Sequence, residues 1–167
     1  MGALIMDIYR FLAENDVSYQ RADHSPVYTY QEAEDRVTPL PGVHTKNLFL
    51  RDGKGRRHFL VVVEGAMRVD LKALRGMLGV DKLGMASAER LKKHLGVEPG
   101  AVTLLGVVND LQRAVELVFD RAVWAADALQ CHPLVNTSTL VIARVDVERL
   151  LECTGHAWQV LTVRTVD

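Results

Sequence analysis

The sequence has no excess of basic residues, because 20 lysines and arginines stand against 21 aspartates and glutamates in 167 residues. Proteins that grip duplex nucleic acid carry a strong basic excess, so any nucleic-acid contact is expected to be local. The two cysteines, Cys131 and Cys153, indicate no disulfide framework. The longest apolar runs are five residues, as in 59–63, whereas a transmembrane helix needs about 20. We therefore expect no membrane partner.

The first residues also lack an export signal. Residues 1–9 contain Asp7 and have neither a basic start nor a signal-peptide core, so we expect a cytoplasmic location. The motifs G-x-S-x-G, H-E-x-x-H and C-x-x-C and the glycine-rich phosphate loops are missing. No two of the six histidines lie three to five residues apart, so the chain offers no local metal-ligand pair. We predict no metal and no cofactor.

Apolar periodicity and turn signals predict both helices and strands. Helices are expected at residues 4–12, 29–36, 71–78, 88–95 and 146–153, with a short one near Ala122. Strands are expected at residues 17–23, 46–51, 58–64, 102–108, 115–120, 139–145 and 158–163. The irregular alternation predicts an α+β fold, with one domain over residues 1–167 and helices around a curved, mixed β-sheet.

Local signals sharpen three of these elements. Thr29 and Glu32 match a capping box at the start of a helix. The turn 52–55 contains two glycines and predicts a β-hairpin between residues 46–51 and 58–64. Because residues 59–63 are all apolar, the second hairpin strand should be buried on both faces.

Three segments carry features that core packing does not require. Residues 44–47 (His-Thr-Lys-Asn) follow a Pro–Gly loop, which presents Lys46 toward an end of the sheet. Residues 100–110 hold Gly106 within an apolar strand, and residues 131–139 place Pro133 before amide and hydroxyl groups that can aim at a ligand. Each segment also has a structural interpretation: a solvated edge lysine, a bulge at the glycine, and a self-bonded turn.

Taken in order, these segments resemble the YbaK/prolyl-tRNA-synthetase editing-domain superfamily, and within it the free-standing alanyl-tRNA(Pro) deacylases of the ProXp-ala group. The resemblance rests on residues 24–29 (HSPVYT), 32–33 (EA), 45–50 (TKNLFL), 100–110 and 132–137 (HPLVNT). It extends over nearly the whole chain and implies the editing-domain fold.

The resemblance also implies an activity. It is hydrolysis of the ester that joins a wrong amino acid, alanine, to the terminal adenosine of proline tRNA, with prolyl-tRNA synthetase or an elongation factor as further partners. Lys46 and Asn47 are the implied catalytic residues, and the lysine would hold the 3′-end through phosphate or ribose. The implied substrate-binding residues are Tyr28, Gly106, His132, Pro133, Asn136 and Thr137. The ribose 2′-OH would help to activate water.

The chain departs from the family pattern at two places. Related editing domains carry a Gly-x-x-x-Pro loop whose backbone donors are assigned to the carbonyl oxygen, but the residue four positions before Pro133 is Leu129. Many relatives also have Pro-Phe where this chain has Leu104 and Leu105.

The missing motifs agree with this chemistry, because an aminoacyl ester is already activated and its hydrolysis mainly needs positioning, water and charge stabilisation. Two alternatives stay open: a deacylase for another small amino acid or another tRNA, and a non-catalytic module that binds a tRNA end or a synthetase. The hairpin cluster of Arg51, Lys54, Arg56 and Arg57 is a candidate tRNA contact or a solvated surface. Arg90, Lys92 and Lys93 form a second basic cluster.

Overall fold

The computed structural model describes residues 7–29, 31–32, 35 and 39–166. Both helices and strands are present, which confirms the predicted α+β class. Their order along the chain is α1 (Ile8–Glu14), β1 (Gln20–Asp23), β2 (Val43–Asp52), β3 (His58–Glu64), α3 (Leu71–Leu78), β4 (Leu83–Met85), α4 (Ala88–Leu95), the 3-10 helix η1 (Leu104–Asn109), β5 (Val115–Asp120), α5 (Arg121–Trp124), β6 (Ala128–Cys131), β7 (Ser138–Ala143), α6 (Arg144–Thr154) and β8 (Trp158–Leu161).

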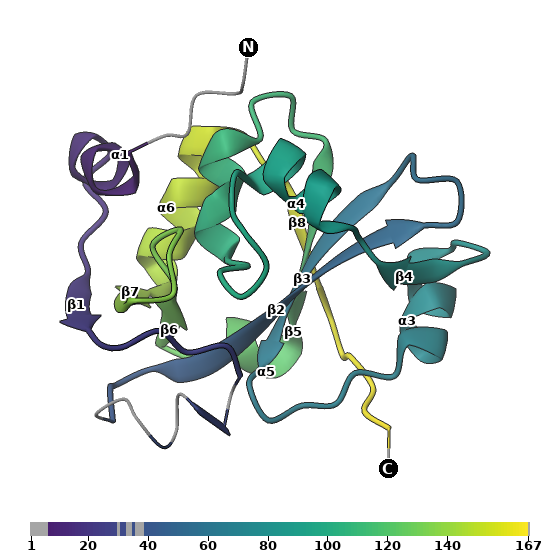
Figure 1. The fold of residues 1–167 in the computed structure, drawn as a ribbon, viewed down its shortest axis with the longest axis horizontal. Coiled ribbons are helices and arrows are strands. Elements are labelled where there is room, and N and C mark those ends of the chain that lie inside the picture. The colour runs from purple at the N-terminus through teal and green to yellow at the C-terminus, as the bar shows by residue number, and fades with distance from the viewer. Residues whose placement is uncertain (1–6, 30, 33–34, 36–38, 167) are drawn as a thin grey trace.

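The strands form one mixed sheet with the order β1-β7-β6-β2-β3-β5-β8, and β4 also pairs with β2 (Figure 1). The pairs β1–β7, β6–β7, β2–β3 and β2–β4 are antiparallel. The pairs β2–β6, β3–β5 and β5–β8 are parallel. Within the described residues, no helix is both long and apolar enough to cross a bilayer.

Strand β3 separates two apolar clusters, which explains its uninterrupted run of apolar residues. Successive side chains point to opposite faces of a strand. Leu60 and Val62 therefore join the cluster that contains buried residues of α1, α4, η1 and α6. Phe59, Val61 and Val63 join the second cluster, which contains α3. The predicted burial of this strand on both faces is confirmed, since residues 58–63 are all buried.

Side-chain caps fix the starts of α3 and α4. The Asp70 carboxylate accepts a hydrogen bond from the N–H of Ala73, and the Ser87 hydroxyl accepts one from Arg90. Gly79 and Gly96 end the two helices in the left-handed conformation, with φ of 70° and 67°. Since glycine adopts positive φ without steric cost, both stops are explained by the sequence.

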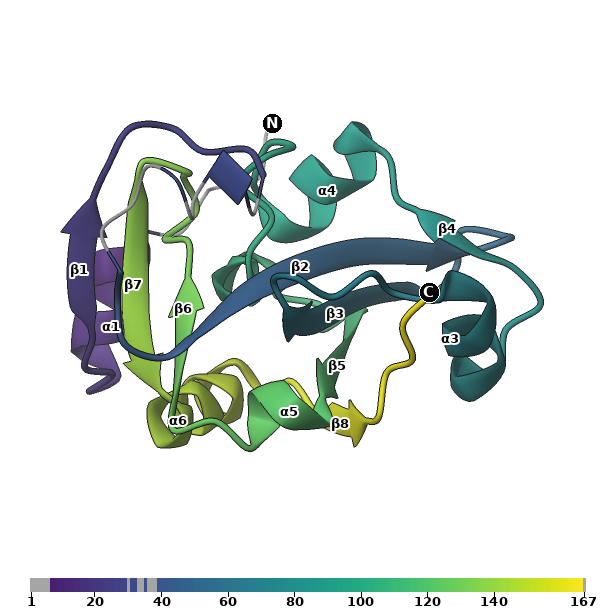
Figure 2. The same cartoon turned by 90° about the horizontal axis from the view of Figure 1, so that it is seen from below.

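Strand β2 is the longest strand among the described residues and runs between two groups of elements (Figure 2). One of its edges is paired along most of its length with β3. The other edge pairs with β6 only at Val43 and His44 and with β4 only at Leu50–Asp52. Between these two pairings, no described strand covers the edge. This interruption positions the candidate site.

The predicted strand at residues 102–108 is wrong. Thr103 is extended, but η1 begins at Leu104, and the Thr103 hydroxyl caps it by accepting from the N–H of Leu105. A 3-10 helix forms here because Gly106 permits close packing: a Cβ on this residue would lie 2.8 Å from the Cβ of Leu95. The close backbone contact expected at Gly106 is therefore present, although in a helix rather than in a strand.

Other bounds also differ from the prediction. Strand β1 begins at Gln20 instead of residue 17, and α6 begins at Arg144 instead of residue 146. Strands β4 and β6 were not predicted. Leu4 of the first predicted helix lies outside the described residues, as do residues 30, 33–34 and 36–38 in and just after the second. The capping-box bond of that second helix is present, since the Thr29 hydroxyl accepts from the N–H of Glu32 at 3.1 Å.

Candidate functional site

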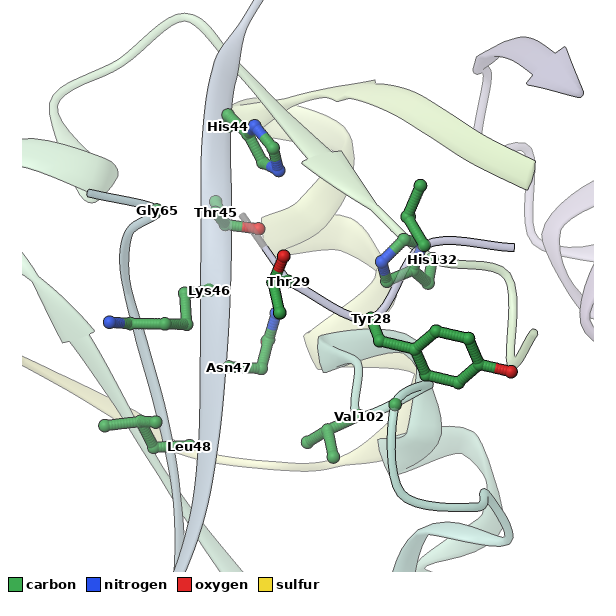
Figure 3. Close-up of a pocket in the computed structure, with 12 residues that line it drawn as sticks. Tyr28, Thr29, His44, Thr45, Lys46, Asn47, Leu48, Gly65, Val102 and His132 are labelled. Atoms are coloured by element: carbon green, nitrogen blue, oxygen red, sulfur yellow. The ribbon is translucent and has the colours of Figure 1, made fainter. Parts of the chain in front are cut away.

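A cavity of about 460 Å³ lies at the uncovered edge of β2. Three segments that are distant in the sequence face β2 across it (Figure 3). The cavity is lined by Val27, Tyr28, Thr29, His44, Thr45, Lys46, Asn47, Leu48, Gly65, Gly100, Val102 and His132. Four predicted site residues, Tyr28, Lys46, Asn47 and His132, are thus brought together.

Hydrogen bonds hold the wall segments to one another. The N–H of His24 donates to the carbonyl of Thr137 at 2.9 Å, and the side-chain amide of Asn136 donates to the carbonyl of Val27 at 3.0 Å. The Thr103 hydroxyl donates to the carbonyl of His132 at 2.6 Å. Residues 24–28, 100–103 and 132–137 therefore form one connected wall, which preorganises the cavity.

The uncovered edge of β2 presents backbone groups to this cavity. The carbonyl of His44 accepts from Gly65 on the β3 side, whereas the carbonyl of Phe49 accepts from Ala86 on the β4 side. Because the backbone groups of successive strand residues point to alternate edges, the N–H and C=O of Asn47 point to the edge that β6 and β4 leave uncovered. A ligand along this edge finds one N–H donor and one carbonyl acceptor already in place.

The side chain of Asn47 adds a second acceptor. Its Oδ1 is buried and has no hydrogen-bond partner among the described residues. Leaving a buried acceptor unpaired costs about 1–3 kcal/mol. A ligand hydroxyl or ammonium group that reached this oxygen would remove that cost.

Lys46 approaches the cavity from the opposite side of β2 to His132 (Figure 3). It shares a face of the strand with Leu48, and its ammonium donates to the carbonyl of Met67. Burial lowers the pKa of Lys46, and the positive charge of Arg68 lowers it further. At an open strand edge a ligand is accessible from both faces of the sheet, so this placement allows contact from the side away from His132.

His132 is held in one orientation, and its surroundings disfavour the protonated form. Its Nδ1 lies 3.1 Å from the carbonyl oxygen of Ser138. Since a carbonyl only accepts, Nδ1 carries a proton, and in the neutral ring Nε2 is then the acceptor. Burial lowers the pKa of His132, and the nearby His24 and His44 act in the same direction against the bond to Ser138.

The cavity does not contain an activated hydroxyl nucleophile among its described residues. The Thr45 hydroxyl donates to the carbonyl of Gln130 at 2.6 Å, and that of Thr29 accepts from Glu32. Neither bond involves a histidine that could act as a base. In the described part of the chain, no group of three or more His, Cys, Asp or Glu side chains is arranged to hold a metal ion. The arrangement favours binding and polarising a substrate over attacking it covalently.

Four other predicted substrate-binding residues lie outside this cavity. Gly106 is buried against Leu95, and Pro133 is buried in its loop. Thr137 is exposed, and its carbonyl holds His24. Asn136 lines a neighbouring cavity.

The four basic residues of the hairpin differ in their surroundings. Arg57 forms two hydrogen bonds of 2.9 Å with the Glu116 carboxylate. A guanidinium of Arg51 donates to the carbonyls of Asp52 and Gly53. Lys54 and Arg56 are exposed. The charge of Arg57 is therefore largely compensated within the protein.

Sequence reasoning missed Gly65 and Met67. Gly65 closes the end of the cavity, and Met67 holds the Lys46 ammonium through its carbonyl. Both act through their backbones, so residue type carries almost no signal of their role. Val102 lines the cavity inside a segment that was singled out for Gly106.

Residues 24–150 match the family sequence model of the aminoacyl-tRNA editing domain, and this range includes all lining residues of the cavity. The chain belongs to the aminoacyl-tRNA editing domain family. This family membership confirms the predicted resemblance and the predicted enzyme class, an aminoacyl-tRNA hydrolase.

Relatives of this editing domain agree with the assignment. This chain is 38% identical over 150 residues to the prolyl-tRNA editing protein ProX of Acetoanaerobium sticklandii, and the match covers 90% of this chain and 92% of ProX. It is 35% identical over 158 residues to the prolyl-tRNA synthetase associated domain-containing protein 1 of Danio rerio, covering 93% and 85%. A solved structure proposed to be a trans-editing enzyme for prolyl tRNA synthetase matches its fold with a TM-score of 0.67 at 17% identity, covering 98% and 100%.

Proposed function

We propose that this editing domain hydrolyses alanyl-tRNA(Pro), releasing alanine and free proline tRNA. The observation that carries the proposal is the cavity at the uncovered edge of β2, which is lined by Lys46, Asn47 and His132 within the matched residues. The names of the relatives, a prolyl-tRNA editing protein and a prolyl-tRNA synthetase associated protein, support proline tRNA as the carrier.

Alanine follows from the limits of discrimination by size. A synthetase pocket built for proline rejects a smaller amino acid poorly, since one missing methylene is worth only about 1–3 kcal/mol. A separate hydrolase whose pocket admits alanine and excludes proline removes the error. The apolar side chains of Val27 and Val102 in the cavity wall suit a methyl group.

The reaction divides among a few groups of this site. The Asn47 N–H is the donor that we place on the ester carbonyl oxygen, where it would stabilise the negative charge that develops when water attacks. In related editing domains this role is assigned to the backbone of the Gly-x-x-x-Pro loop. In this chain Leu129 stands at the glycine position and is buried in β6, so we give the role to Asn47 instead. Lys46 supplies a compact positive charge for phosphate or ribose oxygen. The neighbouring 2′-OH of the substrate assists the water.

A parallel hydrolysis assay tests the proposal. Ala-tRNA(Pro), Ser-tRNA and Pro-tRNA(Pro) are incubated with the protein at equal concentrations, and the remaining aminoacyl ester is followed with time. We expect rapid loss of alanine and retention of proline. Faster loss of serine would reassign the amino acid, and three stable esters would leave a module that binds without reacting.

A further inference from the structure

A second cavity adjoins the candidate site and shares one wall with it. It has a volume of about 380 Å³, and Tyr28 is the residue that lines both cavities. Its walls include the apolar side chains of Val97, Pro99 and Leu134, and Lys92 lies at it as well. A mostly apolar cleft with an aromatic wall and one cation is suited to a flat heteroaromatic group that carries a phosphate.

Tyr28 is exposed and nevertheless fixed. Tyr28 is 66% exposed, which is unusual for a large aromatic residue in a folded domain. The ring lies against Gly100, where an added Cβ would be 2.7 Å from Cδ1, and Gly100 has a φ of 91°. The N–H of Tyr28 donates to the carboxylate of Glu32 at 3.0 Å. The ring is therefore a supported platform, and Figure 3 shows it pointing away from β2.

Lys92 is the charged group that is available to a phosphate. It forms an ion pair of 3.2 Å with Glu98, and the two side chains are 51% and 69% exposed. An exposed pair of this kind contributes little to stability, so its lysine can exchange partners at small cost.

We propose that this second cavity binds the terminal adenine of the tRNA, with the base stacked on Tyr28 and its 5′-phosphate near Lys92. The inference rests on the proposed function. The aminoacyl ester and the terminal adenine are attached to the same ribose, so an ester bound in the first cavity places the adenine within reach of the adjoining cavity. Stacking on an aromatic side chain does not distinguish one base from another. The bound base is identified as the terminal adenine by its position next to the ester.

A binding cycle on uncharged tRNA tests the subsite apart from any reaction. Dissociation constants are measured for proline tRNA ending in CCA and for the same tRNA ending in CC, with the native protein, Tyr28→Leu and Tyr28→Phe. Loss of stacking on one base corresponds to a roughly 5- to 150-fold change in affinity. We expect a loss in this range when either the terminal adenine or the Tyr28 ring is removed, no further loss when both are removed, and near-native binding by Tyr28→Phe.

Matched variants control for general effects. Tyr19→Leu alters a partly exposed tyrosine that lines neither cavity and should leave both affinities unchanged. Lys92→Gln should make the salt dependence of binding shallower, whereas Lys93→Gln, one residue away on the same helix and also exposed, should not.

Three results would overturn the subsite: losses that simply add when both changes are combined, native binding that does not distinguish the two tRNAs, or no binding by the native protein. Displacement of the tRNA by adenosine 5′-monophosphate at similar concentrations would instead assign the cavity to a free nucleotide. Failure of the alanyl-tRNA hydrolysis assay with an intact coupling between Tyr28 and the terminal adenine would overturn the reaction and keep the subsite.

Discussion

The Lys46 ammonium donates a hydrogen bond to the main-chain carbonyl of Met67, across the loop that follows β3. The partner is a neutral carbonyl, and both burial and the positive charge of Arg68 lower the pKa of this lysine. A lysine held by a carbonyl keeps its charge available to an anionic or polarised ligand oxygen. This pairing is consistent with a resting position beside the uncovered edge of β2.

We predict that Lys46→Ala removes most deacylation and leaves the fold intact. Loss of one charge-assisted contact, worth about 1.5–3 kcal/mol, corresponds to a roughly 10- to 150-fold lower kcat/KM. Lys46→Arg serves as the matched variant, since it keeps the charge but changes the donor geometry, and we expect an intermediate rate. Thermal unfolding should match the native protein in both cases. A folded Lys46→Ala protein with near-native kcat/KM would contradict the site.

We predict that His132 positions the substrate and is not the general base. A base of ordinary pKa would give a pH–rate limb near 6.5, but burial keeps the pKa of His132 below its usual value. The kcat/KM of the native protein should therefore show no such limb from this residue. His132→Asn, whose amide can replace the donor to Ser138, should retain more activity than His132→Ala. A limb near 6.5 that disappears in His132→Ala with unchanged substrate binding would show the opposite.

The fold was largely predictable because its signals are local. Asp70 and Ser87 cap helices within three residues of their partners, and the apolar run at 59–63 reports directly on burial. The 3-10 helix η1 was not predictable in this way, since the packing of Gly106 against Leu95 depends on tertiary contact. An apolar run interrupted by one glycine is compatible with a strand or with a short helix.

The site was predictable only where side chains carry its chemistry. Lys46, Asn47 and His132 were found by residue type and resemblance, whereas the uncovered edge of β2 depends on β4 and β6, which were not predicted. Asp110 shows the same limit, because it is buried and pairs at 2.9 Å with His156, which lies 46 residues later in the chain. Burial and distant partners are properties of the folded chain.

We predict that Arg56 contributes more to tRNA binding than Arg57. Arg57 is already bound to Glu116 through two hydrogen bonds, while Arg56 is exposed at the turn. Arg56→Glu should raise KM for tRNA more than it lowers kcat, because phosphate contacts mainly position the substrate. Its log–log dependence of binding on salt should become shallower by roughly 0.9 for one lost phosphate contact.

The companion variant separates binding from stability. Arg57→Glu places a second carboxylate opposite Glu116, so we expect a lower melting temperature without a comparable change of the salt slope. Both variants are compared by tRNA binding at several salt concentrations and by thermal unfolding. An unchanged slope and affinity for Arg56→Glu would assign the hairpin cluster to the solvated surface.

The last prediction concerns acid stability and rests on His58. This residue is only 5% exposed, and its Nε2 lies 3.0 Å from Arg90, whose guanidinium also donates to the carbonyl of Gly55. Since Arg90 only donates, His58 must be neutral to accept this bond. The rings of His58 and His94 are 4.3 Å apart, so protonation would also place two cations together.

Burial lowers the pKa of His58 to about 4, and the positive charges of His94 and Arg90 act in the same direction. The unfolded chain takes up a proton near its ordinary pKa of about 6.5. Above that pH the histidine is neutral in both states and costs nothing. As the pH falls from about 6.5 toward 4, only the unfolded state gains the proton, so the free energy of unfolding decreases by about 1.4 kcal/mol per pH unit.

We therefore expect the urea concentration at the unfolding midpoint to decrease as the pH is lowered from 7 to 5. This decrease should be smaller in the His58→Gln variant. Glutamine can accept the Arg90 bond through its amide oxygen but does not titrate. His94, whose pKa burial also lowers, still contributes to the pH dependence of the variant. The measurement compares the free energy of unfolding of both proteins at each pH. An identical pH dependence in the native protein and in a folded His58→Gln variant would show that His58 does not contribute to the loss of stability in acid.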